Sequence, residues 1–319
     1  CVPTIAACLP VIPAHAETLE WIGAPGGVFA ASGNWSPSGV PDSGDDLHFG
    51  TSGSSPTATL NSSDIDLGNG TMLLESGEVT VEDVGSLAIG DMNIGQNAAS
   101  DGMLTVTGWN AMVNLRGSTN VGVSGTGALN LSGTYSYGNL VRVGQNSGGV
   151  GSVSMSNFSY FNLSNDLHVG LAGTGNLEVA SGSYLSSLNG TLGYSSGGVG
   201  TATVSGTFSR WDISDGALIG LEGTGRLNVS DGGVVATGSD LIMGQQNSGV
   251  GELTLTDGGQ VYVGRNSTIG LNGTGSVTVA DGSRFTSNAT WVGYLGGSQG
   301  TLTVRDGGAY DSTDDLYMG

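Results

Sequence analysis

The sequence predicts an all-β protein: a right-handed parallel β-helix, or β-solenoid, of about ten coils with ~25 residues per coil. Three observations lead to this prediction. A short element x-h-x-h, in which h is apolar, recurs nine times; its copies follow one another every 24 to 26 residues; and the segments between them are rich in Gly, Ser and Asp. The last apolar positions of the nine copies are Val106, Leu131, Met155, Val179, Val204, Val229, Leu255, Val279 and Val304.

The spacing of the repeat favours a coil built from short strands. Alternating apolar and polar residues indicate a strand with one buried face. A step of ~25 residues accommodates three such strands and their corners, and each coil is expected to stack on the previous one at about 4.8 Å. The 263 residues from Thr57 to Gly319 then form about ten coils, with the last apolar positions of the repeats stacked in one buried column.

A second element closes each repeat with apolar residues and a glycine, as in Val141-Arg142-Val143-Gly144. A short Gly-Thr-Gly turn and a longer Gly-rich turn alternate after it, so the full sequence period is near 50 residues. A β-propeller blade has a similar period, with four strands in ~40–50 residues, and a β-sandwich is a further alternative. We favour the β-helix because both halves of the period contain the same x-h-x-h element.

Residues 1–16 are interpreted as the remnant of a signal peptide. They are mostly apolar, contain both cysteines of the chain, Cys1 and Cys8, and end in Ala14-His15-Ala16, which has the small-x-small pattern of a cleavage site. We therefore expect an exported protein, at the cell surface, in the outer membrane or extracellular, whose mature chain contains no cysteine.

The ends of the repeat region predict the domain organisation. Residues 17–56 contain Trp21, Trp35, Pro37 and Pro41 and lack the repeat, so we expect an N-terminal cap that covers the first coil. Residues 57–319 are the predicted β-helix repeat domain. It ends directly after a closing glycine, so we expect truncation at the C-terminus.

The charge balance excludes some classes of partner. The chain has 27 acidic residues, seven arginines and no lysine, with a formal net charge of −20. Binding to nucleic acid requires basic patches, and docking on anionic lipid requires basic clusters. We expect neither a nucleic-acid partner nor direct membrane insertion by this segment.

Several motifs resemble those of a known class of bacterial surface proteins. Trp21-Ile22-Gly23, Gly33-Asn34-Trp35-Ser36-Pro37 and Gly44-Asp45-Asp46 resemble the start of many autotransporter-type proteins. The repeats resemble those of type V secretion passenger domains and of PEP-CTERM-associated exported proteins. The resemblance covers roughly residues 17–319 and implies a β-helical passenger displayed or released outside an outer membrane; it assigns no particular activity.

The strongest candidate for a metal site is a ladder of aspartates at the turn position after the x-h-x-h strand, Asp231, Asp257, Asp281 and Asp306. Stacked carboxylates repel one another, and a hard cation would relieve the repulsion. The alternative, which we favour, is that Asp-Gly suits a tight turn. His48 and His168 occupy the same slot of the repeat about five coils apart, so they cannot share a metal, and we expect both to be solvated.

An aromatic cluster is a candidate surface for sugar or protein contact: Tyr135, Tyr137, Phe158, Tyr160 and Phe161. We predict a non-catalytic passenger, structural or adhesive, with no catalytic residues and no cofactor, whose partners are host or neighbouring-cell surface glycans or proteins. The alternatives are a carbohydrate-active β-helix enzyme and a cation-stabilised structural module. An enzyme predicts a groove in which acids and arginines converge, whereas an adhesin predicts a smooth rod with outward Thr, Ser and Asn.

Overall fold

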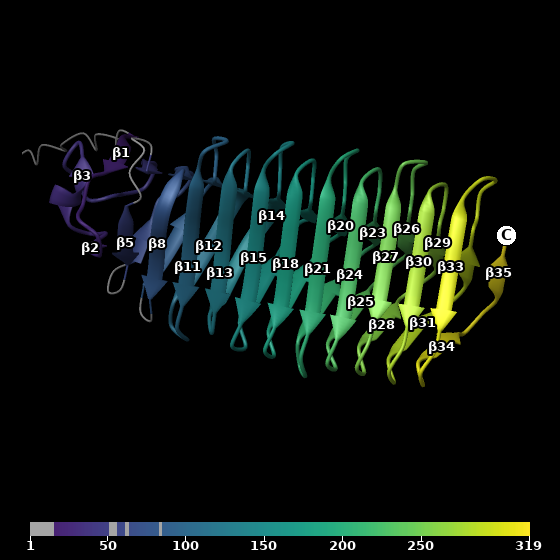
Figure 1. The fold of residues 1–319 in the computed structure, drawn as a ribbon. Helices are drawn as coiled ribbons and strands as arrows, with labels where there is room; N and C mark the ends of the chain where they lie inside the picture. Colours follow the sequence, from purple (N-terminus) through teal and green to yellow (C-terminus); the bar gives the residue numbers. More distant parts are fainter. Residues whose placement is uncertain (1–15, 51–55, 61–63, 83–84) are drawn as a thin grey trace, which may run out of the picture.

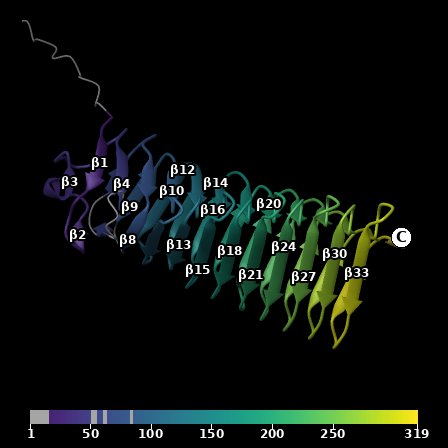
Figure 2. The ribbon, with the colours of Figure 1, turned by 45° about the horizontal axis from the view of Figure 1, so that its top comes forward.

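The computed structural model describes residues 16–50, 56–60, 64–82 and 85–319, and it confirms the parallel β-solenoid. Figure 1 shows a rod of stacked turns, and the rotated view in Figure 2 shows the turns following one another along one axis, from the β1 end to the end marked C. Within the described part of the chain, no helix is both long and apolar enough to cross a membrane. The predicted signal peptide remnant lies outside the described residues except for Ala16.

The first face of the rod is a parallel sheet of 12 strands, one from each turn. Most of these strands have six or seven residues and contain the x-h-x-h element. They are β2 (Gly27–Val28), β5 (Thr57–Leu60), β8 (Ser76–Glu82), β11 (Asp101–Thr107), β13 (Thr126–Ser132), β15 (Val150–Ser156), β18 (Thr174–Ala180), β21 (Val199–Ser205), β24 (Thr224–Ser230), β27 (Val250–Leu255), β30 (Thr274–Val279) and β33 (Gln299–Val304).

The second face consists mainly of four-residue strands, which pair in parallel from turn to turn. These are β6 (Asp64–Asp66), β9 (Ser86–Ile89), β12 (Met112–Val121), β14 (Tyr135–Val143), β16 (Tyr160–Leu163), β19 (Tyr184–Ser187), β22 (Arg210–Ile213), β25 (Val234–Thr237), β28 (Gln260–Val263), β31 (Arg284–Ser287) and β34 (Ala309–Ser312). The longer strands β12 and β14 continue around the corner onto the third face, so these two faces form one sheet.

The third face consists mainly of three-residue strands. These are β1 (Thr18–Trp21), β4 (Asp46–Phe49), β7 (Met72–Leu74), β10 (Met92–Ile94), β17 (Leu167–Val169), β20 (Gly190–Leu192), β23 (Ala217–Ile219), β26 (Leu241–Met243), β29 (Ser267–Ile269), β32 (Thr290–Val292) and β35 (Leu316–Met318). The 3-10 helix η1 (Ser32–Asn34) and strand β3 (Trp35–Ser36) complete the elements, and β3 pairs antiparallel with β1.

On the first face, neighbouring strands pair so that equivalent residues of successive sequence repeats lie opposite one another. Val106 lies opposite Leu131, and Val204 lies opposite Val229. The column is buried from Val106 to Val279, as predicted. Val304 differs from the prediction because it is 44 % exposed: its strand, β33, pairs with β30 alone among the described strands, so one side of its turn is open.

The number of turns is larger than predicted, twelve rather than about ten. One reason is that the N-terminal turns are shorter, since Leu60 pairs with Val81 only 21 residues later. A second reason is that residues 17–56, expected to form a cap, contribute parallel strands to the stack: β1 pairs with β4, and β2 pairs with β5.

An aromatic cluster fills the interior at the N-terminal end of the rod. Trp21, Phe29, Trp35 and Phe49 are buried, and their ring centroids are 5.0 to 6.2 Å apart. The indole Nε1 of Trp35 donates a 2.8 Å hydrogen bond to the carbonyl oxygen of Phe29, which satisfies a polar group that burial would otherwise penalise. The rings give the first turns a large apolar interior without the repeat motif.

Glycines allow close contact where the third face turns into the first. Gly193 ends the third face with φ of +68°, a left-handed conformation that glycine adopts without steric cost. Gly200, at the start of β21, lies so close to the previous turn that a Cβ atom would be 1.9 Å from the carbonyl oxygen of Val169. Equivalent glycines follow the same pattern in successive turns, so this corner depends on the absence of side chains.

Large and small residues compensate for each other inside the rod. Trp211 is buried, and a Cβ atom at Gly190 in the preceding turn would approach its ring to 2.7 Å. Gly138 has the same relation to the side chains of Phe161 and Leu163. The interior is therefore packed between neighbouring turns rather than within one turn.

Candidate functional site

Aspartate and asparagine side chains at the corner between the second and third faces bind the backbone of the following turn. Asp91 Oδ1 accepts a 2.7 Å hydrogen bond from the amide of Ser118, and Asp240 Oδ1 accepts one of 3.1 Å from the amide of Asn266. The adjacent carboxylates of Asp45 and Asp46 also bind backbone amides. Asp45 is buried and accepts hydrogen bonds from two amides, and Asp46 accepts one of 2.6 Å. These carboxylates therefore serve as hydrogen-bond acceptors for backbone N–H groups.

The four aspartates of the candidate cation ladder occupy a left-handed turn position. Their φ angles are between +50° and +53°, and Asp and Asn tolerate this conformation better than most residues. All four side chains are exposed. Asp231 accepts a hydrogen bond from Ser230, and Asp306 pairs with Arg305. The described residues contain no group of three or more His, Cys, Asp or Glu side chains placed to hold a metal ion. The left-handed backbone conformation of the turn accounts for an aspartate at these four positions.

The two histidines stand at equivalent outward positions of the third face, five turns apart, as predicted. The expectation that both are solvated holds only in part for His168, which is of intermediate exposure. Its ring contacts Tyr194 edge-on, with centroids 5.3 Å apart, and its Nδ1 is buried without a hydrogen-bond partner among the described residues. Desolvation lowers the pKa of His168 below its ordinary value, because burial disfavours the charged imidazolium.

Four tyrosines form a strip on the outside of the second face. Tyr135, Tyr160 and Tyr184 lie directly opposite one another in successive turns, and Tyr137 lies two residues after Tyr135. The rings of Tyr160 and Tyr184 stack with centroids 5.2 Å apart and planes 9° apart. Tyr135 and Tyr137, which are 49 % and 43 % exposed, each contact Tyr160. We call these four residues the tyrosine strip.

The predicted aromatic cluster is therefore confirmed in part. Phe161 was expected to belong to it, but its side chain is buried in the core, because it alternates with Tyr160 along the strand. Phe158 is exposed in a turn and lies against Gly182. Tyr184 was not among the predicted residues, although its spacing from Tyr160 matches the repeat. Burial and a hydrogen bond to Asp212 raise the pKa of Tyr184 to about 12, so its hydroxyl stays protonated at neutral pH.

A shallow groove of about 310 Å³ runs beside the tyrosine strip. Its lining combines the ring of Tyr137 with amide, hydroxyl and guanidinium groups. The polar residues lining the groove are Asn114, Arg116, Asn139, Asn162 and Ser164. Side-chain hydrogen bonds between turns position some of them: Ser164 donates to Asn139 over 3.3 Å, and Ser186 donates to Asn162 over 2.8 Å.

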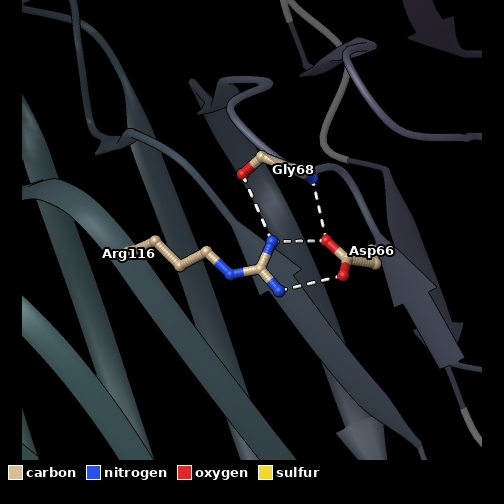
Figure 3. A network of polar contacts seen from close by, with 3 residues as sticks. All are labelled: Asp66, Gly68 and Arg116. Carbon is tan, nitrogen blue, oxygen red and sulfur yellow. Dashed lines mark hydrogen bonds and ion pairs between the residues drawn. The ribbon is translucent and has the colours of Figure 1, made fainter.

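Arg116 reaches back over two turns to Asp66, as Figure 3 shows. Its two terminal nitrogens lie 2.5 and 2.9 Å from the carboxylate oxygens, and the amide of Gly68 donates a further 2.8 Å bond to Asp66. The guanidinium group holds the pKa of Asp66 below its usual value. The register of β12 shifts between Leu115 and Ser118, and Arg116 lies within this irregularity.

Some arginines and acids form ion pairs on the surface of the rod. Arg226 pairs with Glu252, and Arg284 pairs with Asp311, each between neighbouring turns and each partly exposed. Exposed pairs of this kind contribute only about 0–1 kcal/mol to stability. Asp91 and Arg116 line one depression of about 250 Å³, but the former binds a backbone amide and the latter binds Asp66.

Comparison of the chain with protein-family models, with curated proteins and with solved structures found no match.

Proposed function

We propose that this chain is a non-catalytic, exported, surface-displayed β-helical passenger with an adhesive role, and that the tyrosine strip binds glycans of host or neighbouring-cell surfaces. The observation that carries the proposal is the tyrosine strip, in which Tyr135 and Tyr137 are exposed, with the polar groove beside it. The secretion route and the surface location rest on the resemblance to autotransporter passengers and PEP-CTERM-associated proteins.

The chemistry of the strip suits an uncharged sugar chain. Tyrosine rings supply flat apolar area with a polar tip, and the apolar face of a pyranose ring stacks on such a surface. The amides of Asn114 and Asn162 each carry both a donor and an acceptor, the combination that a sugar hydroxyl requires. With a net charge of −20 the chain repels polyanionic chains, so neutral glycans are favoured.

The form of the molecule supports an adhesive role. The turns are stacked at regular intervals along the rod (Figure 2), so one extended ligand contacts several of them, and several weak contacts combine into a stronger attachment.

We expect the double substitution Tyr137→Ala and Asn162→Ala to weaken binding to neutral cell-surface polysaccharide by about tenfold or more. An aromatic contact contributes about 0.5–1.5 kcal/mol beyond its area, a hydrogen bond contributes a similar amount, and about 1.4 kcal/mol corresponds to a factor of ten. The measurement is retention of the purified protein on immobilised neutral polysaccharides.

Tyr294→Ala is the matched control, because Tyr294 is also exposed but lies outside the strip. The control is expected to bind like the unmodified protein. Equal retention of all three proteins would contradict the assignment of the strip, and new reducing ends released from the polysaccharide would favour an enzyme instead.

A further inference from the structure

A second groove, of about 500 Å³, lies along the corner between the second and third faces. It crosses four successive turns, those of β17, β20, β23 and β26. Its floor consists of the outward middle residues of these strands, His168, Thr191, Leu218 and Ile242, and Tyr194 stands at its edge. Three carboxylates, from Asp166, Asp215 and Asp240, also line it, and its lining includes no arginine. We call this site the acidic groove.

The three carboxylates differ in how they are engaged. Asp166 accepts a 2.8 Å hydrogen bond from the Asn189 side chain, and Asp240 accepts one from the amide of Asn266. The carboxylate of Asp215 is exposed, and in the described part of the chain it has neither a hydrogen-bond donor nor an ion-pair partner. The rim of the groove thus contains an uncompensated negative charge.

Two polar groups on the floor also lack partners. Thr191 is only 3 % exposed, and no described residue forms a hydrogen bond with its hydroxyl. In the neighbouring turn, directly opposite Thr191, the Nδ1 of His168 is buried and unpaired among the described residues. Buried polar groups normally have hydrogen-bond partners. Both residues line the groove, and the Thr191 hydroxyl is the unpaired group that a bound ligand can reach.

The available groups are mostly hydrogen-bond acceptors. Carboxylates accept only, a threonine hydroxyl can accept, and a neutral imidazole presents one acceptor nitrogen. Desolvation lowers the pKa of His168, which favours the neutral ring. Leu218 and Ile242 add an apolar floor between the polar groups. The complementary ligand is cationic, carries several N–H donors and has an aliphatic body.

We propose that the acidic groove binds a linear aliphatic polyamine. The methylene segments of the ligand lie on Leu218 and Ile242, and its ammonium groups reach the Asp215 carboxylate and the Thr191 hydroxyl. This inference concerns a site separate from the tyrosine strip and goes beyond the proposed function.

Two features favour a small polyamine over a basic peptide. The groove crosses four parallel strands whose backbone groups already pair with each other, so an added peptide strand would find no free sheet edge there. Its volume is within the range of small-molecule sites, about 300–1,000 Å³.

The test is isothermal titration calorimetry of the full chain with spermidine, a linear triamine. Because a chain with net charge −20 attracts any polycation, the variants decide the result. We expect saturable binding at one site, weakened about tenfold by Asp215→Asn, since a hydrogen bond to a charged group is lost. Asp231→Asn removes the same charge from an exposed turn outside the groove and is expected to leave the affinity unchanged.

A second variant tests the floor without changing the charge. Thr191→Val keeps the shape of the side chain and removes its hydroxyl, and we expect it to weaken spermidine binding severalfold. Circular dichroism checks that each variant is folded. Equal affinities of Asp215→Asn and Asp231→Asn, or the absence of saturable binding, would overturn the proposal. Tighter binding of a trilysine peptide than of spermidine would overturn it in favour of a protein partner. Retention on neutral polysaccharide by Asp215→Asn should be unchanged, which separates this test from that of the tyrosine strip.

Discussion

Val229→Asp is expected to unfold several turns of the solenoid together. Val229 is fully buried in β24 and lies between Val204 and Leu255 of the neighbouring turns. A carboxylate introduced there has no partner, and an uncompensated buried charge costs about 3–5 kcal/mol. Because each turn buries its apolar face only against its neighbours, the damage spreads along the stack. Thermal melting followed by circular dichroism measures the loss.

Asn228→Asp is the matched control, since it introduces the same side chain on the same strand but on the outward face, where Asn228 is partly exposed. Its melting temperature should stay close to that of the unmodified protein. If the two variants melted at similar temperatures, Val229 would not face a closed interior.

Gly200→Ala is expected to destabilise the rod although it adds only one methyl group. That methyl would lie 1.9 Å from the carbonyl oxygen of Val169 and 2.6 Å from the amide nitrogen of Gly193. Neither backbone atom belongs to a flexible side chain, so two turns must move apart. Overpacking of a core typically costs about 1–3 kcal/mol, and a clash with backbone on this scale is expected to reach the upper end. Chemical denaturation measures the change in free energy of unfolding.

Gly296→Ala controls for the loss of glycine itself. A Cβ atom at Gly296 would meet no atom within 4 Å, so this variant is expected to be neutral or slightly more stable through the reduced entropy of the unfolded chain. A Gly200→Ala protein as stable as the Gly296→Ala protein would show that the turns are not in contact at this corner.

The first face could be predicted from the sequence almost residue by residue. Its strands contain one alternating motif at a nearly constant step, and the observed pairs, such as Leu131 with Met155, are those of the repeat. Stacking in parallel turns requires this agreement, because a shift of one residue would turn every apolar side chain outward.

The number of turns could not be predicted as well, for a physical reason. The first turns contain no repeated motif and are closed instead by an aromatic cluster around Trp35. The packing between turns could not be predicted from the sequence either. Gly190 interrupts the apolar pattern of the third face, and the ring of Trp211 in the next turn occupies the space that a side chain at this position would need. Such compensation depends on which residues become neighbours after folding.

The candidate sites were harder to predict because outward positions are free to vary from turn to turn. Tyr135 and Tyr160 could be identified as aromatic surface residues, and the repeat spacing would also have identified Tyr184. The acidic groove has no comparable pattern in the sequence. Its floor takes one residue from each of four turns, and only the register places His168 beside Thr191.

The most direct test of the stacked-turn architecture is a series of distances between pairs of spin labels, in a chain whose two native cysteines are replaced by serine. One label stays at Thr105, and the second is placed in turn at Asn228, Thr254, Thr278 or Thr303, which occupy equivalent outward positions of successive turns. A parallel solenoid predicts distances that rise by about 4.8 Å per turn, from roughly 24 Å to roughly 38 Å. Distances that rise and then fall, as around the ring of a propeller, would contradict it.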